Sequence, residues 1–333
     1  MDLNPLPKVE LHLHLDCSLS YDVVSELRPS VTRGEYERDF IAPAKCTNLA
    51  DFLSRAPAGI ALMQTERALE RVVEDLLRQL RADGVIYAEL RFAPLLHTRA
   101  GLGAEEVVEI VERAMDRASR ASGVEARLIL CTLRHFSQAQ SLRTVRLVER
   151  FQGARVVALD LAADEAGFPL EAHIPAFRYA IERDIPRIAH AGEARGPDSV
   201  WETLRQLQPA RLGHGVRSIE DPALLDHLKA REIHLELCPS CNVQIDIYDT
   251  YADHPIDRLY AAGLSVGVST DGRTLTGITL TQEYERLRQA FGWGMAHFLQ
   301  CNLNALRAAF VPAAVRQRLE RRLVEGYGVT VDS

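Results

Sequence analysis

Short apolar stretches alternate with longer amphipathic ones along most of the chain. Period-two or continuous apolar patterns indicate buried strands, and apolar residues spaced three and four apart indicate helices. Strands are predicted at 8–15, 85–92, 126–133, 156–162, 187–190, 211–214, 233–237 and 264–269. From residue 85 onward, helices are predicted between them at 104–121, 138–151, 170–183, 199–207, 221–231 and 257–262.

Eight strands that alternate with helices predict an α/β protein whose strands run parallel. Eight such units in a chain of 333 residues favour a closed (β/α)8 TIM barrel. An open, doubly wound sheet is the alternative.

Extra helices are expected after the first strand and at the C-terminus. Asn48–Leu53 reads as a short capped helix, and Thr65–Ala82 is strongly amphipathic and ends at Gly84. After Asp271 the pattern is helical, at 279–291, 293–306 and 312–327. No composition shift marks a boundary, so residues 1–333 are predicted to form a single domain.

Composition narrows the classes of partner. The net charge is −7 and no block of Lys and Arg occurs, which argues against nucleic acid. No apolar run is long enough to span a membrane, and residues 1–7 do not resemble a signal peptide. The six cysteines are scattered, as expected for a cytoplasmic protein. We expect a small-molecule substrate and a monomer or homodimer.

Reactive side chains gather where strands are predicted to end. His12 and His14 lie on one face of the first strand, because successive side chains of a strand point to opposite faces. Other predicted strands end at His190 with Glu193 beyond it, at His214 and at Asp271. Barrels carry their active sites at this end of the strands. Singly, each residue has an ordinary alternative as a core histidine, turn residue, helix cap or solvated acid.

Together these residues predict a metal-dependent hydrolase. Three histidines and a carboxylate can bind zinc or a similar ion, which activates water at neutral pH. Glu193 can protonate a ring nitrogen while the adjacent carbon is attacked. His214 can accept a proton from the attacking water or hold the hydroxide electrostatically. The metal-ligand candidates are His12, His14, His190 and Asp271.

Two other motifs superficially suggest a function but do not match the sequence pattern that this function requires. His234-Leu235-Glu236 with Cys238-Pro239-Ser240-Cys241 lacks the spacing of the zinc deaminases that act on flipped bases. The same cysteine pair could be redox-active. Gly101-Leu102-Gly103 lacks the third glycine of a dinucleotide-binding loop.

The chain resembles the adenosine deaminases, within the metal-dependent amidohydrolases, over most of its length. The matching segments are Lys8–Asp16, Leu90–Pro94, Asp160–Ala162, His190–Glu193, Gly213–Gly215, Cys238-Pro239 with Asn242, and Ser269–Asp271. The resemblance implies a (β/α)8 barrel, one Zn²⁺ per chain, and hydrolytic removal of the 6-amino group of a purine nucleoside.

The resemblance also implies roles. His12, His14, His190 and Asp271 match the metal ligands, with Glu193, His214 and Asp271 as the catalytic groups. Substrate contacts are implied for His14, Asp16, Ala163 and Gly272; Asp16 favours a nucleoside over free adenine. Leu49, Phe52 and Leu53 match an apolar lid or, equally, form an ordinary buried helix face.

Three positions depart from the family pattern. Cys17 and Ala163 stand where glycine is usual. Gly272 replaces a second Asp, or Asn, that contacts the imidazole side of the purine. Losing such a hydrogen bond costs about 1–3 kcal/mol, unless water or Arg273 replaces it.

The leading hypothesis is zinc-dependent deamination of adenosine or 2′-deoxyadenosine to inosine and ammonia. The alternatives are a related 6-aminopurine (adenine, N6-methyl-AMP or a 5′-modified adenosine) and a non-catalytic metal-binding barrel.

Overall fold

The structure, a computed structural model, describes residues 2–328. Its eight strands form one parallel sheet in chain order. They are β1 (Lys8–His14), β2 (Val85–Phe92), β3 (Glu125–Leu133), β4 (Val156–Ala162), β5 (Arg187–Ala191), β6 (Arg211–His214), β7 (His234–Leu237) and β8 (Val266–Val268).

The sheet closes into a barrel where β1 pairs with Asp271, in the turn that follows β8. His14 N–H donates to the Asp271 carbonyl (2.6 Å) and Asp271 N–H donates to the His12 carbonyl (3.1 Å). A parallel bridge joins Leu13 and Asp271. The predicted (β/α)8 barrel is confirmed, and the open doubly wound sheet is excluded.

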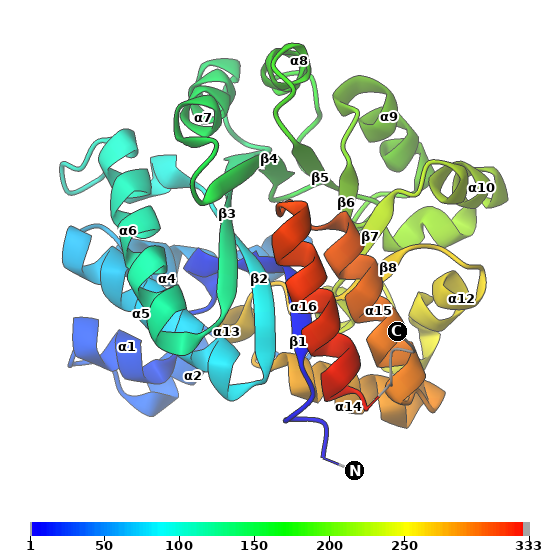
Figure 1. The fold of residues 1–333 in the computed structure, drawn as a ribbon. Helices are drawn as coiled ribbons and strands as arrows, with labels where there is room; N and C mark the ends of the chain where they lie inside the picture. Colours follow the sequence, from blue (N-terminus) through cyan, green and yellow to red (C-terminus); the bar gives the residue numbers. More distant parts are fainter. Residues whose placement is uncertain (1, 329–333) are drawn as a thin grey trace.

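Helices surround the barrel, as the ring of α6 to α12 in Figure 1 shows. Those between consecutive strands from β2 onward include α6 (Ala104–Ser122), α7 (Gln138–Phe151), α8 (Ile174–Glu182), α9 (Pro197–Leu207), α10 (Pro222–Ala230) and α12 (Ile256–Ala261). Their apolar faces and the outward strand side chains form one large core.

The connection from β1 to β2 contains more helices than the sequence predicted. α3 (Leu49–Leu53) and α5 (Glu66–Ala82) were expected; α1 (Tyr21–Leu27), α2 (Arg33–Asp39) and α4 (Ala56–Leu62) were not. Short helices also follow β7 and β8, as α11 (Pro239–Gln244) and α13 (Arg273–Thr276). α4 and α13 contact Leu15–Cys17, which follow β1, and α11 contacts α13, so these three helices lie at the end of the barrel where the strands terminate.

The C-terminal helices are α14 (Leu280–Phe291), α15 (Met295–Ala308) and α16 (Ala313–Gly326), near the positions predicted for them. Figure 1 shows α15 and α16, in orange and red, near β1, and α15 contacts β1, β7 and β8. Beyond α15, Phe310 packs against the buried Arg211 guanidinium, 4.1 Å from the ring centre, and closes the opposite end of the barrel. That residues 1–333 form a single domain stays a prediction.

None of the helices within residues 2–328 is long and apolar enough to cross a membrane. The six cysteines, all within this range, are free thiols, and five of them are buried.

Candidate metal centre and catalytic cavity

The first strand places two imidazoles in the barrel interior. Leu11 and Leu13 alternate with His12 and His14, so that the leucines join the outer core while the histidines point inward. His12 is fully buried and His14 is partly exposed.

Four side chains from three parts of the sheet converge on one point. The Nε2 atoms of His14 and His190 are 3.2 Å apart. Asp271 Oδ1 lies 3.3 Å from His14 Nε2 and 3.5 Å from His12 Nε2. Tetrahedral ligands with bonds of about 2 Å to one ion are themselves about 3.3 Å apart, so this spacing fits a shared metal ion.

Carboxylates behind the histidines fix their orientation. His12 Nδ1 lies 3.0 Å from Glu236 Oε2, and His190 Nδ1 lies 3.2 Å from Asp160 Oδ1. An Nδ1–H donated to a carboxylate leaves the Nε2 lone pair free for a metal. His12 Nε2 is buried and, within residues 2–328, has no hydrogen-bond partner. Arg91 joins the two carboxylates, at 2.9 Å from Asp160 and 2.6 Å from Glu236.

Burial keeps the imidazoles of His12 and His14 neutral. It lowers the pKa of His14 to about 4, although the nearby Asp271 carboxylate acts in the opposite direction. Burial also holds the pKa of His12 well below its usual range, with Arg91 adding to the effect. Neutral imidazole is the form that binds metals.

Gly213 on β6 makes room for this arrangement. It pairs with His190 in the sheet. A Cβ atom at 213 would lie 2.9 Å from His12 Cε1 and 3.0 Å from His190 Nδ1. The two rings can approach each other because no side chain separates them.

Glu193 and His214 lie beside the converging ligands. His214 Nε2 is 3.4 Å from Glu193 Oε1. The Asn242 amide lies 3.2 Å from His214 Nδ1, and the Cys241 thiol lies 3.8 Å from Glu193 Oε1. Burial, together with the charges of Asp271 and Glu165, raises the pKa of Glu193 well above its usual range. These effects favour the protonated form of the Glu193 carboxyl.

The turn that carries Glu193 is bound to a second buried acid. Glu165 accepts hydrogen bonds from the backbone N–H groups of Gly192 (2.8 Å), Glu193 (3.0 Å) and Arg195 (2.9 Å). It also accepts one from the Ser199 hydroxyl (2.6 Å). Four donors on one carboxylate fix the backbone at Glu193.

Three residues at the strand ends have left-handed backbone conformations although they are not glycine. The φ angles are +78° at Ala163, +57° at His214 and +68° at Asp271. Such conformations are costly for L-residues and concentrate at functional sites. Here they turn the chain sharply where the strands end.

A cavity of about 380 Å³ opens beside the cluster. Its lining includes His14, Asp16, Cys17, Leu53 and Ala163. Asp16 is buried, 3.6 Å from His97 Nε2. Burial acts to raise the pKa of Asp16, but the interaction with His97 lowers it below its usual value, so Asp16 is ionised.

The other residues that were predicted to contact or cover the substrate do not all face the cavity. Gly272 follows Asp271, but Cys17 stands in contact with it. Arg273 points away from the cavity, because its guanidinium binds Glu10 and Asp83, each at 2.8 Å. The expectation that Arg273 could reach the purine is therefore wrong. Of the three apolar lid residues, Leu53 lines the cavity, while Leu49 and Phe52 are buried in a small neighbouring core.

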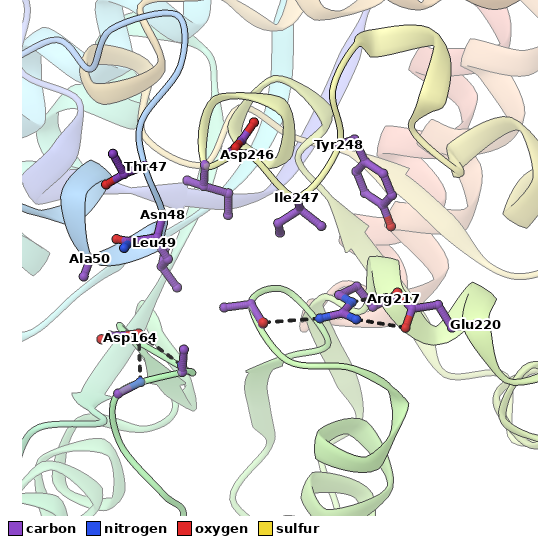
Figure 2. A pocket seen from close by; sticks show the side chains of 14 residues that line it. Thr47, Asn48, Leu49, Ala50, Asp164, Arg217, Glu220, Asp246, Ile247 and Tyr248 are labelled. Atoms are coloured by element: carbon purple, nitrogen blue, oxygen red, sulfur yellow. Dashed lines mark hydrogen bonds and ion pairs between the residues drawn. The ribbon is translucent and has the colours of Figure 1, made fainter.

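A second hollow, of about 620 Å³, lies beyond the N-terminus of α3 (Figure 2) and shares Ala50 and Asp164 with the first. Its charged groups are already paired. Figure 2 shows Arg217 directed at Glu220, at 2.7 Å. Arg217 also donates to the Ala194 carbonyl (3.3 Å). The first cavity, in contrast, is lined by His14 of the imidazole cluster and by Asp16.

Sequence reasoning missed the supporting residues. None of Glu165, Glu236, Arg91, His97 and Cys241 was assigned a role in this site. Arg91 and Glu236 could have been noticed as charged residues inside apolar strands, where burial without a partner is prohibitively costly. For Glu165, His97 and Cys241 the sequence offers no comparable signal.

A (β/α)8 barrel with imidazoles and a carboxylate converging at the strand ends is the architecture of a metal-dependent hydrolase. Comparison with known proteins specifies the class further. The sequence model described as "Adenosine deaminase" matches residues 7–325. The chain is 34% identical to the adenosine deaminase of Lacticaseibacillus paracasei, across 98% of this chain and 97% of that protein. It is 36% identical to adenosine deaminase 1 of Streptomyces coelicolor, across 92% of this chain and 83% of that protein.

The chain belongs to the adenosine deaminase family. It is a hydrolytic deaminase, as the resemblance predicted, and the family is metal-dependent.

Solved structures show the same barrel. An adenine deaminase from Arthrobacter aurescens superposes with a TM-score of 0.88 at 28% identity, covering 96% of this chain and 98% of that one. A zinc-bound amidohydrolase from Burkholderia ambifaria also has a TM-score of 0.88, at 23% identity, covering 98% of this chain and 92% of that one.

Proposed function

We propose that the protein hydrolyses adenosine, or 2′-deoxyadenosine, to inosine and ammonia, with one zinc ion per chain. The convergence of three imidazole nitrogens and the Asp271 carboxylate, with Glu193 and His214 beside them, carries this proposal. The relatives named adenosine deaminase support the choice of substrate.

His12, His14, His190 and Asp271 would hold the ion. When bound, zinc activates a water molecule for attack at neutral pH. Asp160 and Glu236 keep the imidazoles oriented through their Nδ1 atoms. Asp271 also lies close enough to His214 to share a hydrogen-bonded water.

Glu193 acts as the general acid. Its raised pKa keeps a proton on the carboxyl at neutral pH, ready for the ring nitrogen next to the attacked carbon. The nearby Cys241 thiol and the Glu165 hydrogen bonds keep the carboxyl in place.

His214 holds the attacking oxygen. Because the Asn242 amide donates to Nδ1, the Nε2 atom carries the ring hydrogen and can donate to that oxygen. Burial lowers the pKa of His214 to about 3, although Asp271 acts to raise it. Of the two roles that the sequence left open, this tautomer favours holding the oxygen.

The cavity accounts for binding of the nucleoside. Ionised Asp16, with His14 beside it, is placed to accept hydrogen bonds from ribose hydroxyls. Ala163 lines the same cavity and would offer its backbone N–H to the base. Leu53 supplies apolar cover.

A substrate panel tests the proposal. Steady-state kcat/KM is measured for adenosine, 2′-deoxyadenosine, adenine, N6-methyl-AMP and a 5′-modified adenosine, by loss of the 6-aminopurine absorbance. We expect the first two compounds to be the best substrates. If adenosine reacts no faster than the other three, the choice of substrate is wrong.

Glu193→Gln tests whether the barrel is catalytic. The amide cannot supply the proton, so we expect kcat to fall by about 10²–10⁴-fold while bound zinc, measured by elemental analysis, stays unchanged. Glu202→Gln, at a partly exposed acid of α9, is the control and should behave as wild type. Unchanged turnover in Glu193→Gln would remove this residue from the mechanism.

A further inference from the structure

The structure leaves no room for a side chain at position 272. The backbone there is extended, with φ −132°, a conformation that any residue can adopt. A Cβ atom at 272 would lie 2.6 Å from Cys17 Cβ and 2.9 Å from the Cys17 carbonyl oxygen. The Cys17 side chain therefore occupies the space that a residue at 272 would need.

Hydrogen bonds hold the two segments together. Arg273 N–H donates to Ser18 Oγ (3.1 Å), and Ser18 Oγ donates to the His14 carbonyl (2.6 Å). Thr274 Oγ1 donates to the Leu19 carbonyl (2.6 Å). The residues on both sides of the contact are thus bound, and Cys17 and Gly272 cannot easily move apart.

The contact lies on a particular side of the substrate. Glu193 follows β5, whereas Cys17 and Gly272 follow β1 and β8, about half a turn around the closed sheet. In a 6-aminopurine, ring N1 flanks the attacked carbon on one side, and C5 with N7 flanks it on the other. If Glu193 protonates N1, the imidazole edge of the purine lies on the opposite side. That edge then faces Cys17, which lines the cavity.

We propose that Cys17 and Gly272 act as one steric unit that sets the substrate range of the deaminase. Cys17 excludes any side chain from 272 and presents a thiol, a weak hydrogen-bonding group, to the imidazole edge. The substrate class is then 6-aminopurine nucleosides in general, including those whose N7 is replaced by C–H. This inference rests on the proposed function.

The steric part is tested by thermal unfolding, which does not require activity. Gly272→Asp should lower Tm. Cys17→Gly should restore it in the double variant, because the clashing Cβ is removed and a glycine at 17 lets the carbonyl shift. Cys17→Ala should not restore it, since alanine keeps the Cβ. Gly294→Asp is a matched control: φ there is −127°, and no described atom lies within 4 Å of an added Cβ.

The specificity part is tested with 7-deazaadenosine, which lacks the N7 acceptor but keeps the amino group and the ribose. In the wild type, the ratio of kcat/KM for adenosine to that for 7-deazaadenosine should reflect only the lower reactivity of the deaza ring toward attack, because no strong hydrogen bond to N7 is lost. In Cys17→Gly/Gly272→Asp, a carboxyl group reaches the imidazole edge. The preference for adenosine should then rise by about 10- to 100-fold.

Two results would overturn the inference. One is equal rescue of Gly272→Asp by Cys17→Gly and Cys17→Ala, or no loss of Tm in Gly272→Asp. The other is a preference for adenosine over 7-deazaadenosine that is the same in the wild type and in Cys17→Gly/Gly272→Asp. If neither compound is turned over but the Tm pattern holds, the proposed function fails while the steric unit stands.

Discussion

Ala163 has a backbone conformation that costs an L-residue about 1–2 kcal/mol. Its φ is +78°, in the left-handed region that glycine adopts readily. We expect Ala163→Gly to raise the free energy of unfolding by up to about 1 kcal/mol, since greater freedom of the unfolded chain offsets part of the relief. Urea denaturation measures the change.

The matched control for this prediction lies on the strand before it. Ala158 is buried in β4 and has an ordinary strand backbone. Ala158→Gly should therefore lower stability by about 0.5–1 kcal/mol or more. An equal loss in both variants would show that the left-handed conformation at Ala163 is not strained.

The sequence identified individual reactive residues better than their partners. His12, His14, His190 and Asp271 stood out because they follow strand patterns and share one end of a predicted barrel, where the structure brings them together. Glu165 did not stand out. Its four donors lie 27 to 34 positions away, and only the fold brings them to its carboxylate.

At the scale of elements, length decided what could be predicted. α5 has seventeen residues and a continuous apolar face, and its limits were predicted to within one residue. The seven residues each of α1, α2 and α4 span about two turns, too few for a 3.6-residue period to show. β8 was predicted as 264–269, but only Val266–Val268 pair in the sheet.

The turn after β5 should depend on Glu165. In Glu165→Gln, one carboxylate oxygen becomes an NH2 group that cannot accept the N–H donors facing it. We expect a loss of about 1–3 kcal/mol in unfolding free energy and a lower kcat, because Glu193 is no longer held. Bound zinc should not change.

A control distinguishes this effect from general charge removal. Asp164 is the adjacent acid, and among residues 2–328 its Oδ1 accepts only from Ala166 and Gly167, in its own turn. Asp164→Asn should affect kcat much less. A kcat equal to wild type in Glu165→Gln would show that the Glu193 turn is fixed by other contacts.

For the whole molecule, the barrel could be predicted because its strands and helices alternate along the chain. The charge network inside it could not, because its members come from β2, β4, β6 and β7. Arg211 binds both Glu89 and Glu236, and Glu236 in turn binds Arg91. The arginines and glutamates compensate one another's charge only when their strands are brought together, so the network can be recognised only in the closed sheet.

Buried imidazoles should make the whole fold sensitive to acid. His234 is 1% exposed, its Nδ1 lies 2.9 Å from Ser265 Oγ, and burial lowers its pKa to about 3 from 6.5. Between these pH values the unfolded chain binds a proton that the folded chain does not. Unfolding free energy therefore falls as pH falls, by about 1.4 kcal/mol per pH unit for this residue.

Urea denaturation at pH 7 and pH 5 measures this dependence. Wild-type stability should decrease toward pH 5, and His234→Leu should reduce the decrease by about 2 kcal/mol. His227→Gln, at a half-buried residue of α10, is the control. A pH dependence unchanged by His234→Leu would show that this imidazole is protonated in the folded protein.

Stepwise return of zinc to the chelated protein, with adenosine turnover as the readout, determines whether deamination depends on one metal ion at the strand ends. We predict no turnover without metal, a linear rise up to one equivalent of zinc per chain, and no further rise. In His190→Ala the same titration should show weaker binding and little turnover. Full turnover by the metal-free wild type, or full zinc occupancy in His190→Ala, would contradict the account.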